Sequence, residues 1–123
     1  MTPSLPASLR RFAIVIAGLV ACAAQAEGPT RRFALFIGNN EGGEGTRPLL
    51  YATDDAKRMH EVMIRLGGTT SNDAMLLLNE SSDDVLTALA ELERRARDAR
   101  THGDRTSLFF YYSGHAKDGA LRL

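Results

Sequence analysis

The sequence predicts an α/β fold in which helices cover a mainly parallel sheet. Three short apolar runs, each followed by a turn signal, are typical of strands buried on both faces of such a sheet. Two longer stretches between them carry apolar residues three and four positions apart, which is the spacing of one buried helix face. The resulting order is strand, helix, strand, helix, strand, and crossover helices of this kind join parallel strands. With 123 residues, 44% of them hydrophobic, the chain suits a single domain.

A glycine-rich loop separates the first predicted strand from the first helix. Phe33–Ile37 is a continuous apolar run that ends at Gly38, and it predicts the strand. The loop Asn39–Pro48 contains three glycines and a proline, which exclude a regular element. A helix is expected over Tyr51–Leu66 and should end at the glycine pair 67–68. Its predicted apolar stripe consists of Ala52, Ala56, Met59, Met63 and Leu66.

The second half of the chain repeats the pattern of strand, helix and strand. Ala74–Leu78 predicts the second strand, and Ser82 is the expected N-cap of the second helix. That helix should end near His102, and Ser107–Tyr112 predicts the third strand. The predicted buried stripe of the second helix consists of Val85, Leu89, Leu92, Ala96 and Ala99.

The N-terminal segment has the features of an export signal. Two arginines precede an apolar stretch over residues 12–24, which is too short to span a bilayer comfortably. The A-x-A sequence at residues 24–26 fits a cleavage site that would leave Glu27 as the new N-terminus. A linker over 27–31 and one domain over 32–123 would remain, and export to the periplasm or out of the cell is expected.

Two alternatives for this segment stay open. Residues 19–22 are similar to a bacterial lipobox, in which Cys22 is lipidated and becomes the first residue. Membrane contact is expected in that case, and otherwise only if the segment stays as an uncleaved anchor. Cys22 is the only cysteine, so no disulfide can form within the chain.

The charge pattern and the loop argue against nucleic acid and nucleotide partners. The formal net charge is zero and the basic residues are scattered, so there is no electrostatic footprint for nucleic acid. The glycine-rich loop lacks the third glycine of a dinucleotide fingerprint and the Gly-Lys-Ser/Thr of a P-loop. A nucleotide site at Gly42–Gly45 is therefore the least favoured alternative, and no cofactor is expected.

His115 is the candidate functional side chain because of its place after the third strand. The carboxyl ends of strands are where sites form in open α/β sheets. Gly114 lacks a Cβ, which permits a sharp turn and close approach of a substrate, and Ser113 adds a hydroxyl. His60 and His102 are not accompanied by a ligand cluster at metal-binding spacing, so no metal is expected.

The stretch FFYYSGHAKDGA, residues 109–120, resembles the histidine motif of caspase-like cysteine peptidases, a group with caspases, metacaspases and bacterial relatives. Their pattern is an aromatic-rich strand followed by Tyr-Ser-Gly-His-Gly, and only the last glycine differs, being Ala116 here. RRFALFIGNN resembles the family's first strand and Gly-Asn turn. LLYATDDAKRM resembles the start of its first helix, where bacterial members carry Tyr-Ala-x-x-Asp-Ala. The resemblance, from about Arg32 to Leu123, implies a three-layer caspase-like fold truncated after the third strand.

The resemblance implies a cysteine endopeptidase that acts on peptides or proteins. His115 matches the catalytic histidine, which polarises a cysteine thiol and then protonates the leaving amine. The backbone N–H of Gly114 matches a donor to the oxyanion. Asp55 and Ser113 match positions that line the substrate pocket of metacaspases, where Asp55 would favour Arg or Lys; the helix dipole alone would also favour an aspartate there. Arg47 resembles instead the arginine that gives caspases their preference for aspartate, so substrate charge stays open.

The resemblance also implies a nucleophile that this chain does not carry. In caspases the cysteine follows the histidine by about 50 residues, at the end of the next strand. Counted from His115, that place lies beyond Leu123, and Cys22 belongs to the export segment. We therefore expect half of a catalytic dyad, without peptidase activity of its own. The alternative is a non-catalytic interaction module or pseudo-peptidase. Without a fourth strand, the third becomes an apolar edge, so poor solubility or partial unfolding is expected.

Overall fold

A computed structural model describes residues 28–123 of the chain. The predicted export signal and Cys22 lie outside the described residues. Within residues 28–123, no helix has the length and apolar character needed to cross a membrane.

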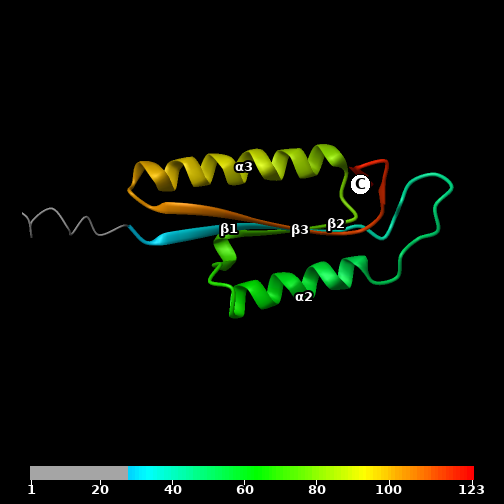
Figure 1. Cartoon of the computed structure of the whole chain (residues 1–123), viewed down its shortest axis with the longest axis horizontal. Coiled ribbons are helices and arrows are strands. Elements are labelled where there is room, and N and C mark those ends of the chain that lie inside the picture. The colour runs from blue at the N-terminus through cyan, green and yellow to red at the C-terminus, as the bar shows by residue number, and fades with distance from the viewer. Residues whose placement is uncertain (1–27) are drawn as a thin grey trace, which may run out of the picture.

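The described chain forms a three-stranded parallel sheet between two helices, as the sequence predicts (Figure 1). Helix α3 covers one face of the sheet and helix α2 covers the other, which gives three layers. The strand order is β2-β1-β3, and β1 pairs in parallel with both neighbours. The elements are β1 (Thr30–Gly38), α2 (Ala52–Arg65), the 3₁₀ turn η1 (Ser71–Asp73), β2 (Ala74–Leu78), α3 (Ser82–Thr101), β3 (Arg105–Ser113), β4 (Ala116–Lys117) and β5 (Ala120–Leu121).

Several element boundaries differ from the sequence prediction. β1 and β3 begin at Thr30 and Arg105, because these two residues already pair in the parallel ladder although their side chains are exposed. The N-cap of α3 is Ser81 and not Ser82. Ser81 accepts a hydrogen bond from the Asp84 N–H, and the Asp84 carboxylate accepts one from the Ser81 N–H, which completes a capping box. Leu66 follows the end of α2 and is 84% exposed, so it does not belong to the buried stripe.

The core is organised around β1, whose residues Phe33–Ile37 are almost fully buried. Because side chains alternate along a strand, β1 contributes to both faces. Phe33, Leu35 and Ile37 pack with the buried face of α3. Phe36 lies on the α2 side, where its ring meets the His60 ring edge-on with centroids 5.3 Å apart. The continuous apolar run of β1 therefore reflects its central place in the sheet.

An ion pair ties the start of β1 to the turn before β2. The Arg31 guanidinium donates to both carboxylate oxygens of Asp73 at 2.7 Å. Asp73 is 3% exposed and also accepts a hydrogen bond from the Thr70 hydroxyl. The hydrogen bonds from Arg31 hold the pKa of the Asp73 carboxyl below its ordinary value. The charged form of Asp73 is thus the form that stabilises the fold.

Asp73→Asn is expected to lower the free energy of unfolding by about 1–2 kcal/mol at pH 7, because a charge-assisted pair is lost next to a part-exposed arginine. The folded-state pKa is depressed, so the contribution of Asp73 is complete above its unfolded value of 3.8 and fades as the pH falls below it. Urea unfolding followed by circular dichroism gives the free energy of unfolding of the wild type and the variant at pH 7 and at pH 3. If the variant is less stable by the same amount at both pH values, the charged form of Asp73 is not the one that stabilises the fold.

β3 is an edge strand of the described sheet, and it exposes apolar side chains. Leu108 and Phe110 are 57% and 43% exposed, and they lie on the α3 side, paired with Phe33 and Leu35 of β1. Beside them is a hollow of about 240 Å³, lined partly by Leu89 and Leu92 of α3. An apolar edge of this kind is a template for pairing with other chains.

Leu108→Lys is expected to raise the soluble fraction of the chain, because a lysine on an edge strand opposes pairing with a second edge. The soluble fraction after expression and centrifugation measures the effect. Leu66→Lys is the matched control, since it adds the same charge at an exposed apolar position just after the end of α2. A gain of equal size in both variants would show that net charge, and not the β3 edge, limits solubility.

Candidate functional site

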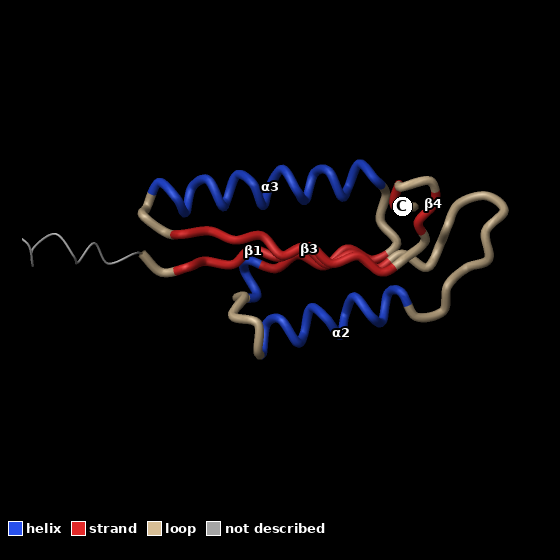
Figure 2. The backbone as a smooth tube through the Cα atoms, viewed as in Figure 1, coloured by secondary structure: helices blue, strands red, loops and turns tan. Residues whose placement is uncertain are grey.

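The carboxyl ends of the three parallel strands meet at one edge of the sheet, where the glycine-rich loop and the β4–β5 hairpin also lie (Figure 2). Backbone hydrogen bonds hold these ends together. The Asn39 N–H donates to the Ser113 carbonyl at 2.9 Å, and the Asn79 N–H donates to the Gly38 carbonyl at 2.8 Å. His115 follows β3 at this edge, as the sequence predicts.

Asparagine side chains fix the loop that leaves β1. The Asn40 N–H donates to the Asn79 side-chain oxygen at 2.9 Å. The Asn40 side-chain oxygen accepts from the Thr53 N–H at 3.2 Å, in the first turn of α2. Tyr51, the N-cap of α2, makes no capping hydrogen bond with its side chain. Asn40 therefore satisfies one of the free donors of this helix from outside it.

The imidazole of His115 has a defined orientation. Its Nε2 lies 3.0 Å from the backbone carbonyl oxygen of Arg47. A carbonyl oxygen only accepts hydrogen bonds, so this contact assigns a proton to Nε2, and Nδ1 is then the acceptor in the neutral ring. The ring also packs against Gly42, where a Cβ would lie 2.7 Å from the ring Cγ. The loop thus needs glycine at position 42 because the His115 ring occupies that space.

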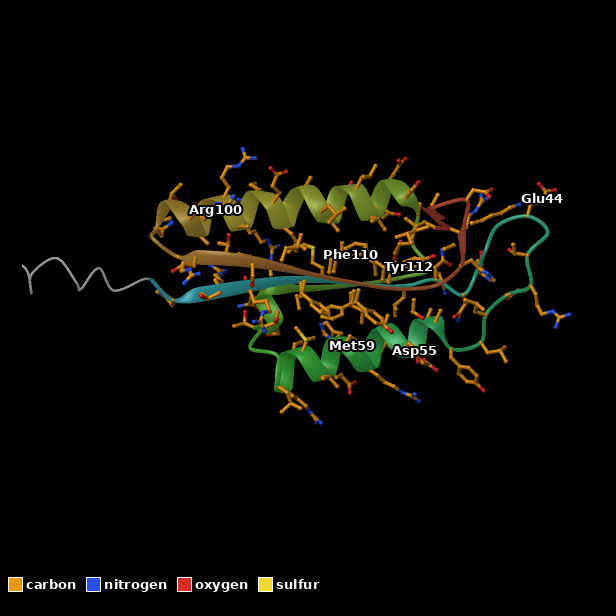
Figure 3. All side chains as sticks on the ribbon, in the orientation of Figure 1. Glu44, Asp55, Met59, Arg100, Phe110 and Tyr112 are labelled. Atoms are coloured by element: carbon orange, nitrogen blue, oxygen red, sulfur yellow. The ribbon has the colours of Figure 1, made fainter. Side chains whose placement is uncertain are left out.

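A hollow of about 320 Å³ lies beside His115, between the glycine-rich loop and the hairpin. Glu44 from the loop and Lys117 and Arg122 from the hairpin bring charges of both signs to it. Glu44 stands on the outer part of the loop (Figure 3). The other lining residues are Gly42, Gly43, Thr46 and Ala116. The hollow can receive a polar chain next to the His115 ring.

Gly114 is required by the close packing beneath it. A Cβ at Gly114 would lie 2.6 Å from Cζ of Tyr112 and 3.1 Å from the Asn39 carbonyl oxygen. The Gly114 N–H makes no hydrogen bond to another described residue. It is available to a group bound at this edge of the sheet.

The remaining predicted site residues do not all surround His115. Arg47 contributes its backbone carbonyl to the imidazole, and its side chain is exposed. Ser113 is half-buried, and strand alternation puts its side chain on the face of the sheet that α2 covers. Asp55 is half-buried in the first turn of α2 (Figure 3). Among the described residues that line the hollow beside His115, neither Ser113 nor Asp55 is present.

Sequence reasoning missed the contacts that hold the His115 segment. Asp118 and Gly119 both have positive φ, at 53° and 74°, and they turn the β4–β5 hairpin. The Asp-Gly pair between short strands is the signal that could have revealed this turn. The Tyr112 hydroxyl contacts the His115 and Arg122 carbonyls, and the Asn39 side-chain NH₂ donates to the Arg122 carbonyl. No sequence signal predicts these contacts, because they depend on which carbonyls the folded hairpin brings near.

The described residues contain no group of three or more His, Cys, Asp or Glu side chains that could hold a metal ion. A family model described as the caspase domain matches residues 31–121, most of the described chain. Neither the search of curated proteins nor the search of solved structures gave a match.

Proposed function

The chain belongs to the caspase-domain family, and we propose that it supplies the histidine half of the catalytic dyad of a cysteine endopeptidase. Its α/β fold, with three parallel strands between helices, fits a caspase-like fold truncated after the third strand. The observation that carries the proposal is the hydrogen bond between His115 Nε2 and the Arg47 carbonyl. In the neutral ring that bond leaves Nδ1 as the nitrogen that can accept a proton, and the ring lines the hollow.

In the proposed reaction, His115 acts first as a base and then as an acid. Nδ1 takes the proton of a cysteine thiol, and the thiolate attacks the carbonyl carbon of the peptide bond. The imidazolium is stabilised because its Nε2–H still donates to the Arg47 carbonyl. Nδ1 then gives its proton to the leaving amine, and an acyl-enzyme remains for water to hydrolyse. The free N–H of Gly114 is the proposed donor to the oxyanion.

The nucleophile in this proposal comes from another stretch of polypeptide. The sequence has one cysteine, Cys22, which lies in the predicted export signal. Export through residues 1–26 is part of the proposal, and lipidation at Cys22 is the alternative that would bring the domain to a membrane.

The family relationship supports peptide or protein substrates. Two proposals remain for the charge of the substrate side chain that the enzyme prefers. Asp55 and Ser113 both lie on the α2 side of the sheet at its carboxyl end, where together they would receive an Arg or Lys side chain. The exposed side chain of Arg47 would instead attract an acidic residue. Peptides of both kinds therefore belong in any assay.

A second candidate function is a non-catalytic interaction module on the same fold. The observation that favours it is the lack of any cysteine among residues 28–123. Such a module would bind peptides at the His115 hollow and release them uncut.

The test uses the complete reading frame that contains this chain, assayed on Arg-, Lys- and Asp-containing peptides. We expect hydrolysis that iodoacetamide abolishes. His115→Ala should lower kcat at least about 100-fold, since it removes the general base. His102→Ala is the control, because this exposed histidine ends α3 far from β3's carboxyl end.

The 123-residue chain by itself is expected to cleave none of these peptides. Thiol-dependent hydrolysis by that chain, or full activity in His115→Ala, would refute the proposed roles. If the reading frame contains no second cysteine, the non-catalytic interaction module becomes the favoured function.

A further inference from the structure

The backbone of His115 is held by the hairpin that follows it. The Arg122 N–H donates to the His115 carbonyl at 2.9 Å. Between these two residues, Ala116 pairs with Leu121 and Lys117 pairs with Ala120 in the β4–β5 hairpin. A hairpin of two short pairs is marginal in water, so it needs further contacts to keep one geometry.

Tyr112 supplies such a contact from the core. Its hydroxyl lies 2.7 Å from the His115 carbonyl oxygen and 2.6 Å from the Arg122 carbonyl oxygen, so its one proton can serve either. The ring packs against the cluster formed by β1 and α3, which fixes the position of the hydroxyl (Figure 3). Burial raises the pKa of the Tyr112 phenol, which keeps it a neutral donor at physiological pH.

Asn39 makes the matching contact from the end of β1. It is 3% exposed, and its side-chain NH₂ donates to the Arg122 carbonyl at 3.3 Å. Its side-chain oxygen accepts from the Glu41 N–H at 2.9 Å, at the start of the glycine-rich loop. One side chain thus connects the hairpin after His115 with the loop that carries Gly42 and the Arg47 carbonyl.

We propose that Tyr112 and Asn39 are positioning residues that keep the His115 imidazole on the Arg47 carbonyl. Tyr112 fixes the backbone of His115, and Asn39 fixes the hairpin relative to the loop that holds the ring. Neither touches the imidazole itself. This inference rests on the proposed function for its catalytic meaning, but the geometry it describes does not depend on peptidase activity.

The packing around Tyr112 also explains why position 114 is a glycine. The Tyr112 ring passes directly beneath Gly114, so a side chain there would push the hydroxyl away from both carbonyls. The glycine, the tyrosine and the asparagine therefore form one unit, in which each needs the close approach of the others.

The test measures the rate at which diethyl pyrocarbonate modifies each histidine, by mass spectrometry of peptides from the 123-residue chain. Tyr112→Phe keeps the ring and removes the hydroxyl. We expect the His115 rate to rise about fivefold, as for a lost hydrogen bond that had restrained the ring. His60, which packs against Phe36, and exposed His102 serve as references in the same molecule.

Tyr111→Phe is the matched control, because the Tyr111 ring lies on the other face of the sheet against Phe36. It should leave the His115 rate unchanged. Asn39→Ser is the second variant and should raise the His115 rate in the same direction. An unchanged His115 rate in Tyr112→Phe, or a rise at His60 of the same size, would overturn the inference, since the second result would mean general loss of the fold.

The two proposals fail separately. If the complete reading frame shows no peptidase activity but Tyr112→Phe still frees His115, the positioning role stands and the proposed function falls. If the enzyme is active and the His115 rate does not respond to Tyr112→Phe, the positioning role falls. In an active enzyme, Tyr112→Phe should lower kcat with little change in KM, because the substrate contacts are left intact.

Discussion

The parallel pairing of β1 with β3 is the constraint on which the rest of the structure depends. It runs from Thr30 opposite Arg105 to Gly38 opposite Ser113 without a break. Because the register is continuous, the ends of both strands arrive at one edge, and Asn39 meets Ser113. A slip of one residue would turn every side chain of β3 to the other face and take Tyr112 away from the His115 carbonyl.

The buried side chains of β1 enforce that register. Phe33, Leu35 and Ile37 pack against α3, and Phe36 packs on the α2 side. A shift of the strand by one residue would present each helix with the side chains that now face the other one. Two asparagines directly follow this strand: Asn39 contacts the hairpin, and Asn40 contacts the start of α2. Core packing and site geometry are therefore set by consecutive residues.

The layers and the place of His115 could be predicted because each depends on local pattern. Apolar runs marked the strands, spacing marked the helices, and the carboxyl end of the third strand marked the candidate site. The N-cap at Ser81 was missed because two serines precede two aspartates and only the folded capping box distinguishes them. The partners of His115 could not be predicted, because a backbone carbonyl such as that of Arg47 leaves no trace in residue type.

The central claim is that the protein holds His115 with a proton on Nε2 and a free Nδ1. A two-bond ¹H–¹⁵N correlation spectrum of the ¹⁵N-histidine-labelled chain reports the protonated nitrogen of each ring directly. We expect a dominant Nε2–H form for neutral His115. A dominant Nδ1–H form, or rapid averaging of the two forms like that expected for a free imidazole, would contradict it.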